Sequence, residues 1–209
     1  GPGKGNVDIG GGISLPTYMA GPGSHSWWAM VVLMFVAGSL YLSYVFSYLF
    51  LWTVSPQVWA PAGSPALPWL GWPGLSVVLL LAGSGLIAAA QRLLPPAGMF
   101  RTAVAVLNFL ALACLVGSLG VEIAGHWRTG LSPSETAYGA MVYMAAVLFG
   151  QLTLAVVLMG GFVIARHIAG KLDRERRVGF ENMALLYHYT VAQSLFGLAL
   201  VHGFPRLVA

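Results

Sequence analysis

The chain has 209 residues, of which 58% are hydrophobic and only 8% are charged. Soluble domains carry about 25% charged residues, so a chain this poor in charge cannot cover a surface that faces water. The composition therefore excludes a soluble globular protein and indicates an integral membrane protein. The net charge of +4 does not indicate a nucleic-acid partner, because the basic residues lie between apolar runs. The lone cysteine, Cys114, excludes an internal disulfide and any CxxC metal motif.

Residues 1–26 are rich in glycine and proline and show no hydrophobic period. This composition is typical of a linker or an extended arm. We therefore divide the chain into an N-terminal arm, residues 1–26, and one transmembrane domain, residues 27–209.

Five apolar stretches follow the arm, and each is long enough to cross about 30 Å of hydrocarbon. None carries a charge near its middle, and a continuous helix is the only suitable form because lipid offers the backbone no partner. The expected fold is all-α, a polytopic membrane helix bundle. The expected helices cover residues 27–53, 75–94, 100–125, 133–166 and 180–204.

Helix boundaries are marked by proline, by capping residues and by tryptophan. Prolines crowd the first connection, from Pro56 to Pro73, and Pro95-Pro96 separates the second and third stretches. Ser132 and Glu135 predict the start of the fourth helix, with Ser132 as the cap and Glu135 reaching back to it. An interfacial belt at the span ends is expected for all the tryptophans, Trp27, Trp28, Trp52, Trp59, Trp69, Trp72 and Trp127.

Lysine and arginine are unevenly divided between the two ends of the predicted bundle. Of the 10 such residues, only Arg128 and Arg206 fall on the side of the C-terminus. Because cytoplasmic loops collect basic residues, we expect the N-terminus inside and the C-terminus outside. The mixed-charge run from Lys171 to Arg177 is then a solvated cytoplasmic loop.

Ionisable groups inside spans are the usual mark of chemistry in a membrane. Glu122, Glu135 and Glu181 all fall near predicted span ends, so we interpret them as helix-end or interface residues. No two carboxylates are spaced for acid–base catalysis or for a di-metal site.

The histidines suggest one alternative function, electron transfer through bound haem. His126, His167, His188 and His202 could ligate two haems in a b-type membrane cytochrome. His188, however, has no matching histidine at its depth, and we expect it to be a hydrogen-bonded structural residue. A small transporter or an assembly scaffold is a second alternative, which depends only on the five-span layout.

Several short segments, in order, resemble subunit III of the haem–copper oxidases. Residues 134–139 resemble the D-S-x-Y-G segment that opens the penultimate helix of that family, and 179–181 resemble its F-G-F-E. Tyr187-His188-Tyr189 is in register with its W-H-F. The resemblance covers residues 27–204 and also includes Trp28 to Trp52 with the following prolines, and the small segment Gly83-Ser84-Gly85.

The resemblance implies the five-helix form of a non-catalytic subunit in a proton-pumping cytochrome c oxidase of aerobic electron transport. Such a subunit stabilises the catalytic subunit and binds lipid in the inner (cytoplasmic) membrane of a bacterium. Its implied partners are subunit II and subunit I, to which the arm could join it covalently. Haem and copper are expected in the partner subunit, and no cofactor, metal or redox centre is expected in this chain.

Five polar residues are the structural candidates, and no catalytic role is assigned to them: Glu122, Glu135, Tyr138, Glu181 and His188. The chain also departs from the family. The family's membrane-embedded glutamate would fall near Met34 or Phe35, where this span has no acid. We therefore assign no proton-related role to that position.

Overall fold

A computed structural model describes residues 6–8, 11, 13–16, 25–56, 59, 70–93, 102–169 and 177–208 of the protein. The described part of the arm contains two three-residue strands, β1 (Asn6–Asp8) and β2 (Ser14–Pro16), which pair antiparallel. The five long helices are α1 (His25–Val54), α2 (Gly71–Leu93), α3 (Thr102–Arg128), α4 (Ala137–Ile168) and α5 (Arg177–Leu198). A π-helical segment, η2 (Ala199–Gly203), and a short helix, α6 (Phe204–Val208), continue α5 without a break.

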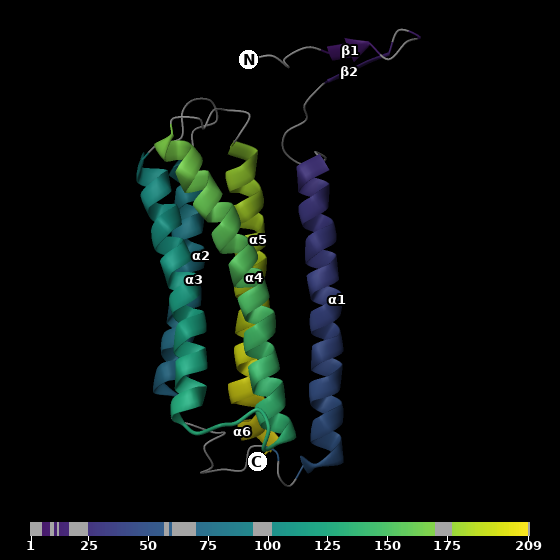
Figure 1. Ribbon diagram of the computed structural model, residues 1–209, viewed down its shortest axis with the longest axis vertical. Helices are drawn as coiled ribbons and strands as arrows, with labels where there is room; N and C mark the ends of the chain where they lie inside the picture. The colour runs from purple at the N-terminus through teal and green to yellow at the C-terminus, as the bar shows by residue number, and fades with distance from the viewer. Residues whose placement is uncertain are drawn as a thin grey trace.

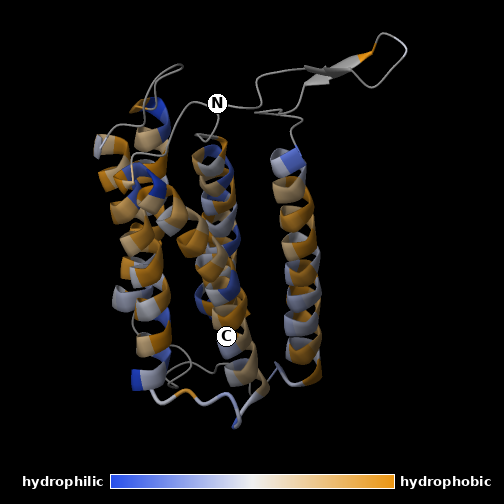
Figure 2. Ribbon diagram, turned by 45° about the horizontal axis from the view of Figure 1, so that its top comes forward, coloured by the Kyte–Doolittle hydropathy of each residue, from blue (hydrophilic) through white to orange (hydrophobic). Residues whose placement is uncertain are grey.

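Within the described residues, five helical segments are long and apolar enough to span a membrane, the last of them running from Val178 to Val208 through η2 and α6. Hydrophobic residues cover most of the length of the helices, and strongly polar residues stand at several helix ends and at a few points along the middle helices (Figure 2). The prediction of an all-α membrane bundle with five spans is thus confirmed.

The start of α4 differs from the prediction. Ser132 and Glu135 do not cap the helix, because residues 133–135 form a turn and Glu135 is exposed. Thr136 is the N-cap instead, and its hydroxyl accepts a hydrogen bond of 2.9 Å from the Gly139 amide. Thr136 takes the cap because it lies three residues before Gly139, whose amide it can reach.

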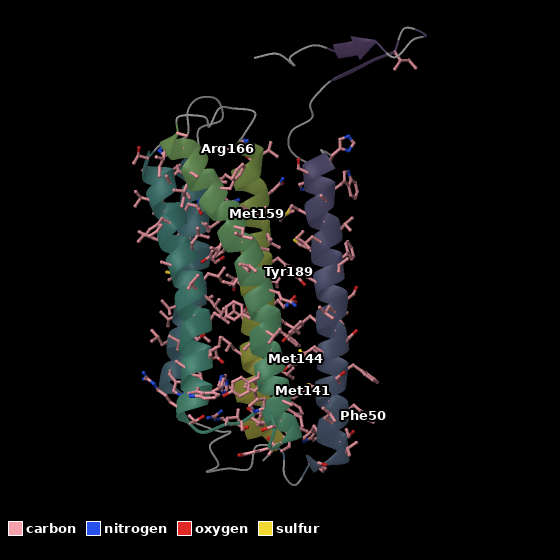
Figure 3. The ribbon with its side chains drawn as sticks, viewed as in Figure 1. Phe50, Met141, Met144, Met159, Arg166 and Tyr189 are labelled. Carbon is pink, nitrogen blue, oxygen red and sulfur yellow. The ribbon has the colours of Figure 1, made fainter. Side chains whose placement is uncertain are left out.

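The helices run side by side and nearly parallel to one long axis (Figure 1). α2 and α3 form the closest pair, α4 and α5 lie in the middle, and α1 lies on the other side against α4 and α5. Buried serines bind α2 to α3, because the Ser76 and Ser118 hydroxyl oxygens lie 2.6 Å apart. The side-chain view shows Arg166 and Phe50 at opposite ends of the bundle (Figure 3).

α1 differs from the other helices in burying only one narrow face. Its buried residues are Tyr41, Tyr44 and Tyr48, which are spaced about one turn apart. Trp59 belongs to the same aromatic cluster, with 4% of its surface exposed, and its indole N–H lies 3.2 Å from the Tyr48 hydroxyl. The assignment of Trp59 to an interfacial belt is therefore wrong, because this indole finds its polar partner inside the protein.

Several predicted features lie outside the described residues. These are most of the proline-rich first connection, the Pro95-Pro96 turn and residues 171–176 of the basic loop. The orientation of the termini stays a prediction.

Candidate functional site

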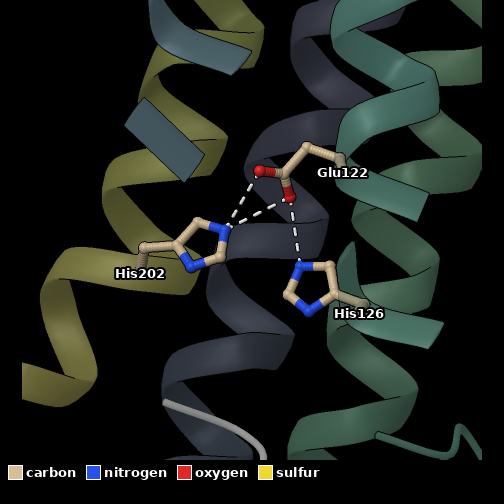
Figure 4. Close-up of side chains that lie close together, drawn as sticks. All are labelled: Glu122, His126 and His202. Carbon is tan, nitrogen blue, oxygen red and sulfur yellow. Dashed lines mark hydrogen bonds and ion pairs between the residues drawn. The ribbon is translucent and has the colours of Figure 1, made fainter. Parts of the chain in front are cut away.

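Three buried polar side chains meet near the end of the bundle that carries the C-terminus (Figures 1 and 4). Glu122 and His126 belong to α3 and His202 belongs to η2, and their exposed fractions are 6%, 2% and 4%. One Glu122 oxygen lies 3.1 Å from His126 Nε2, and the two oxygens lie 3.1 and 3.2 Å from His202 Nε2. A single carboxylate is thus shared by two imidazole rings from different helices.

Local helix geometry explains how the three residues come together. Glu122 and His126 are four residues apart, so α3 presents both on the same face. His202 lies in a π-helical segment, whose wider turn shifts the following side chains around the helix axis. Two tyrosines hold this segment, since Tyr48 and Tyr138 donate hydrogen bonds of 2.8 and 2.6 Å to the Leu200 and Val201 carbonyls.

The two imidazole rings are stacked and fixed by a tryptophan. The planes of His126 and His202 differ by only 9°, with centroids 5.1 Å apart. Trp72 of α2 packs edge-to-face against both, at centroid distances of 4.9 and 5.2 Å. Gly125 permits this contact, because a Cβ atom at that position would overlap the Trp72 ring. The site is therefore rigid and built from three spans.

A small cavity of about 40 Å³ adjoins the cluster and is bordered by Glu122, His126, Tyr41 and Ser194. The hydroxyls of Tyr41 and Ser194 are buried and have no hydrogen-bond partner in the described structure. The cavity wall is otherwise mainly apolar. A cavity of this size has room for one or two water molecules, which need two to four polar partners each, and the polar groups named here are available to them. The cavity therefore gives the cluster room for a small additional ligand.

The interpretation of Glu122 as a helix-end residue is wrong. It lies more than one turn before α3 ends at Arg128, and it is buried between two histidines. The geometry also brings three potential metal ligands together, which was not predicted from the sequence. The expectation that this chain holds no cofactor or metal stays a prediction. The Glu-x-x-x-His spacing of Glu122 and His126 could have predicted that these two side chains lie together. The position of His202 could not be predicted, because the π-helical segment has no sequence signature.

His188 is held by two polar side chains of α2. Its Nε2 lies 2.9 Å from Gln91 Oε1, and its Nδ1 lies 2.6 Å from the Ser84 hydroxyl. Because the amide oxygen can only accept, Nε2 carries the proton and Nδ1 accepts from Ser84. His188 is thus a hydrogen-bonded link between α5 and α2, as expected from the sequence.

The other predicted candidates are dispersed. Tyr138 is buried and donates to the η2 backbone, whereas Glu135 is exposed in the turn before α4. Glu181 is half-buried near the start of α5. It lies about 10 Å along the helix from His188, as seven residues of α-helix require. The structure therefore does not join these residues into one site.

The described histidines do not form the pairs that the di-haem alternative needs. His126 and His202 lie side by side and share Glu122, instead of facing each other across a gap. His188 uses both ring nitrogens, and His167 Nε2 lies 3.4 Å from the Thr102 hydroxyl. This geometry gives the alternative no support in the described part of the chain.

No protein-family model matches the chain, and a search of curated proteins finds no relative.

Proposed function

We propose that the chain is a non-catalytic, subunit III-like component of a proton-pumping haem–copper oxidase. In this proposal it packs against subunit I, binds lipid, and prolongs the working life of the complex in aerobic electron transport. Haem and copper belong to the partner subunit. The observation that carries the proposal is that segments resembling the family, far apart in sequence, contact one another.

The segment Gly83-Ser84 on α2 meets Tyr187-His188 on α5. The Ser84 hydroxyl is 2.6 Å from His188 Nδ1, and Tyr187 Oη occupies the space beside the Gly83 Cα atom. Both segments were matched to the family from sequence alone, and their contact gives a shared physical role.

The remaining matched segments also lie at helix contacts. Tyr138 joins α4 to η2 through its hydrogen bond to the Val201 carbonyl. Phe180, at the start of α5, has no exposed surface. Both residues thus have structural roles within the bundle, as the proposed supporting function requires.

The outer surface suits partners within the membrane. α1 exposes large apolar side chains, among them Phe35 and Phe46 at 74% and 73%. An open groove of about 550 Å³ between α1 and α5 is bordered mainly by apolar groups, including Met34, Tyr189 and Phe196. Tyr189 lies on the side that faces α1 (Figure 3). Acyl chains fit such a groove, because its polar surface is small.

Deletion of the chain tests this function in the native membrane. The expected result is an unchanged haem spectrum and a normal initial rate of oxygen consumption, followed by faster inactivation during turnover. Re-expression of the intact chain should restore the lifetime. Loss of haem from the membrane, or an unchanged inactivation rate, would contradict the proposal.

A further inference from the structure

We propose that Glu122, His126 and His202 bind one divalent transition-metal ion, with Zn²⁺ the best fit, near the C-terminal end of the bundle. The proposal goes beyond the oxidase function and does not depend on it. Zn²⁺ has no redox chemistry. The ion would therefore be structural or regulatory and would not add a redox centre to the chain.

The donor set suits zinc. Two imidazole nitrogens and one carboxylate oxygen form a known three-ligand set, in which a water takes the fourth position. Nitrogen donors also favour transition metals over Mg²⁺ and Ca²⁺, which prefer oxygen ligands. The donor atoms of all three residues lie within 4.8 Å of one another.

The distances from the carboxylate oxygens to the two ring nitrogens are close to those of an occupied site. Metal–ligand bonds of about 2.0–2.1 Å in a tetrahedron place neighbouring ligand atoms about 3.3 Å apart. The Glu122 oxygens lie 3.1 to 3.2 Å from the two Nε2 atoms. Figure 4 shows both Nε2 atoms directed towards the carboxylate. Small rotations of these side chains are therefore enough to place an ion between them.

The protonation state of the rings is compatible with a metal. Nδ1 of His126 and Nδ1 of His202 are both buried and have no hydrogen-bond partner in the described structure. Without a metal, the Glu122 carboxylate accepts a hydrogen bond from each ring and so holds the proton on Nε2. When a cation replaces these donors, the proton moves to Nδ1, where a water has to serve as its acceptor. Each Nε2 lone pair is then available to a cation, and the cation takes over the role of the two N–H donors to Glu122.

Burial and rigidity favour binding over solvation. A buried carboxylate is stable only when it is paired or bound to a metal. Trp72 fixes both rings, and the tyrosine contacts to η2 fix the backbone that carries His202. The adjoining cavity beside Glu122 and His126 leaves room for a water as the fourth ligand.

Metal analysis of the protein purified from its native membrane, with a tag that lacks histidine, tests the proposal. We expect about one zinc per chain, because the three residues form one site with an open fourth position. After removal of the metal by a chelator, Co²⁺ should bind with the visible absorption of a tetrahedral site. Added Zn²⁺ should displace it. Failure of the stripped wild-type protein to bind either ion stoichiometrically would overturn the proposal.

Variants locate the site. Glu122→Gln, His126→Asn and His202→Asn should each weaken Zn²⁺ binding by at least about 100-fold, because even outer-shell changes cost 10–100-fold. His188→Asn and His167→Asn are the matched controls and should retain wild-type affinity. Unchanged Zn²⁺ affinity in all three cluster variants would place the metal elsewhere and contradict the assignment. Haem and copper content in the same samples reports separately on the oxidase function.

Discussion

Tyr187 reaches from α5 past Gly83 of α2 to donate a hydrogen bond of 2.6 Å to the Ala111 carbonyl on α3. The side chain has no exposed surface, and its hydroxyl lies where a Cβ atom at Gly83 would have to be. One aromatic residue thus joins three spans, and it can do so only because α2 has a glycine at the point of contact.

Gly83→Ala should therefore destabilise the bundle by about 1–3 kcal/mol, the usual cost of overpacking a tight core. The matched control is Gly85→Ala on the same helix, where an added Cβ meets open space. Denaturant unfolding in detergent, followed by tryptophan fluorescence, measures both. Equal stability of the two variants would show that Tyr187 does not occupy this position.

Gly125→Ala should disturb the histidine cluster without altering any of its ligands. The new Cβ would overlap Trp72, so the indole must leave its place against His126 and His202. We expect a loss of stability of about 1–3 kcal/mol together with weaker Zn²⁺ binding, measured by competition with Co²⁺. Gly120→Ala, at an open position on the same helix, should change neither quantity.

Removal of the His188 ring should leave two polar groups of α2 without their partner. His188→Ala removes hydrogen bonds from Gln91, which is exposed, and from Ser84, which is partly buried. We expect a loss of about 0.5–1.5 kcal/mol for each bond, the usual net contribution of a hydrogen bond to stability. Thermal unfolding should show this loss. The visible absorption of the purified chain should not change, whereas loss of a haem band would revive the di-haem alternative.

The π-helical segment should depend on its tyrosine contacts. Tyr138→Phe removes one hydrogen bond to the Val201 carbonyl and should cost about 0.5–1.5 kcal/mol. Because His202 follows Val201 directly, the same variant should weaken Zn²⁺ binding. Phe46→Leu, on an exposed face of α1, serves as the control. An unaltered Zn²⁺ affinity in Tyr138→Phe would mean that this contact does not position His202.

The spans could be predicted because hydrophobic length alone determines them. The ends of the helices were harder to predict, since the choice between Ser132 and Thr136 as the cap of α4 depends on local geometry. The sequence predicted that His188 is hydrogen-bonded but did not predict its partners on α2, Ser84 and Gln91.

The cluster was missed for a different reason. Glu122 was interpreted as a span-end residue, although its four-residue spacing from His126 places both side chains on one face of the helix. His202 joins them through an interhelical contact and a π-helical turn, and a single sequence reports neither.

Identification of the proteins that accompany the chain in its native membrane is the most direct test of the proposed function. The membrane is solubilised in mild detergent, complexes are separated under native conditions, and co-migrating polypeptides are identified by mass spectrometry. The proposal predicts a large haem–copper oxidase subunit in the same band, or peptides that run continuously from it into residues 1–26. Migration of the chain alone, or with proteins that carry neither haem nor copper, would contradict the proposal.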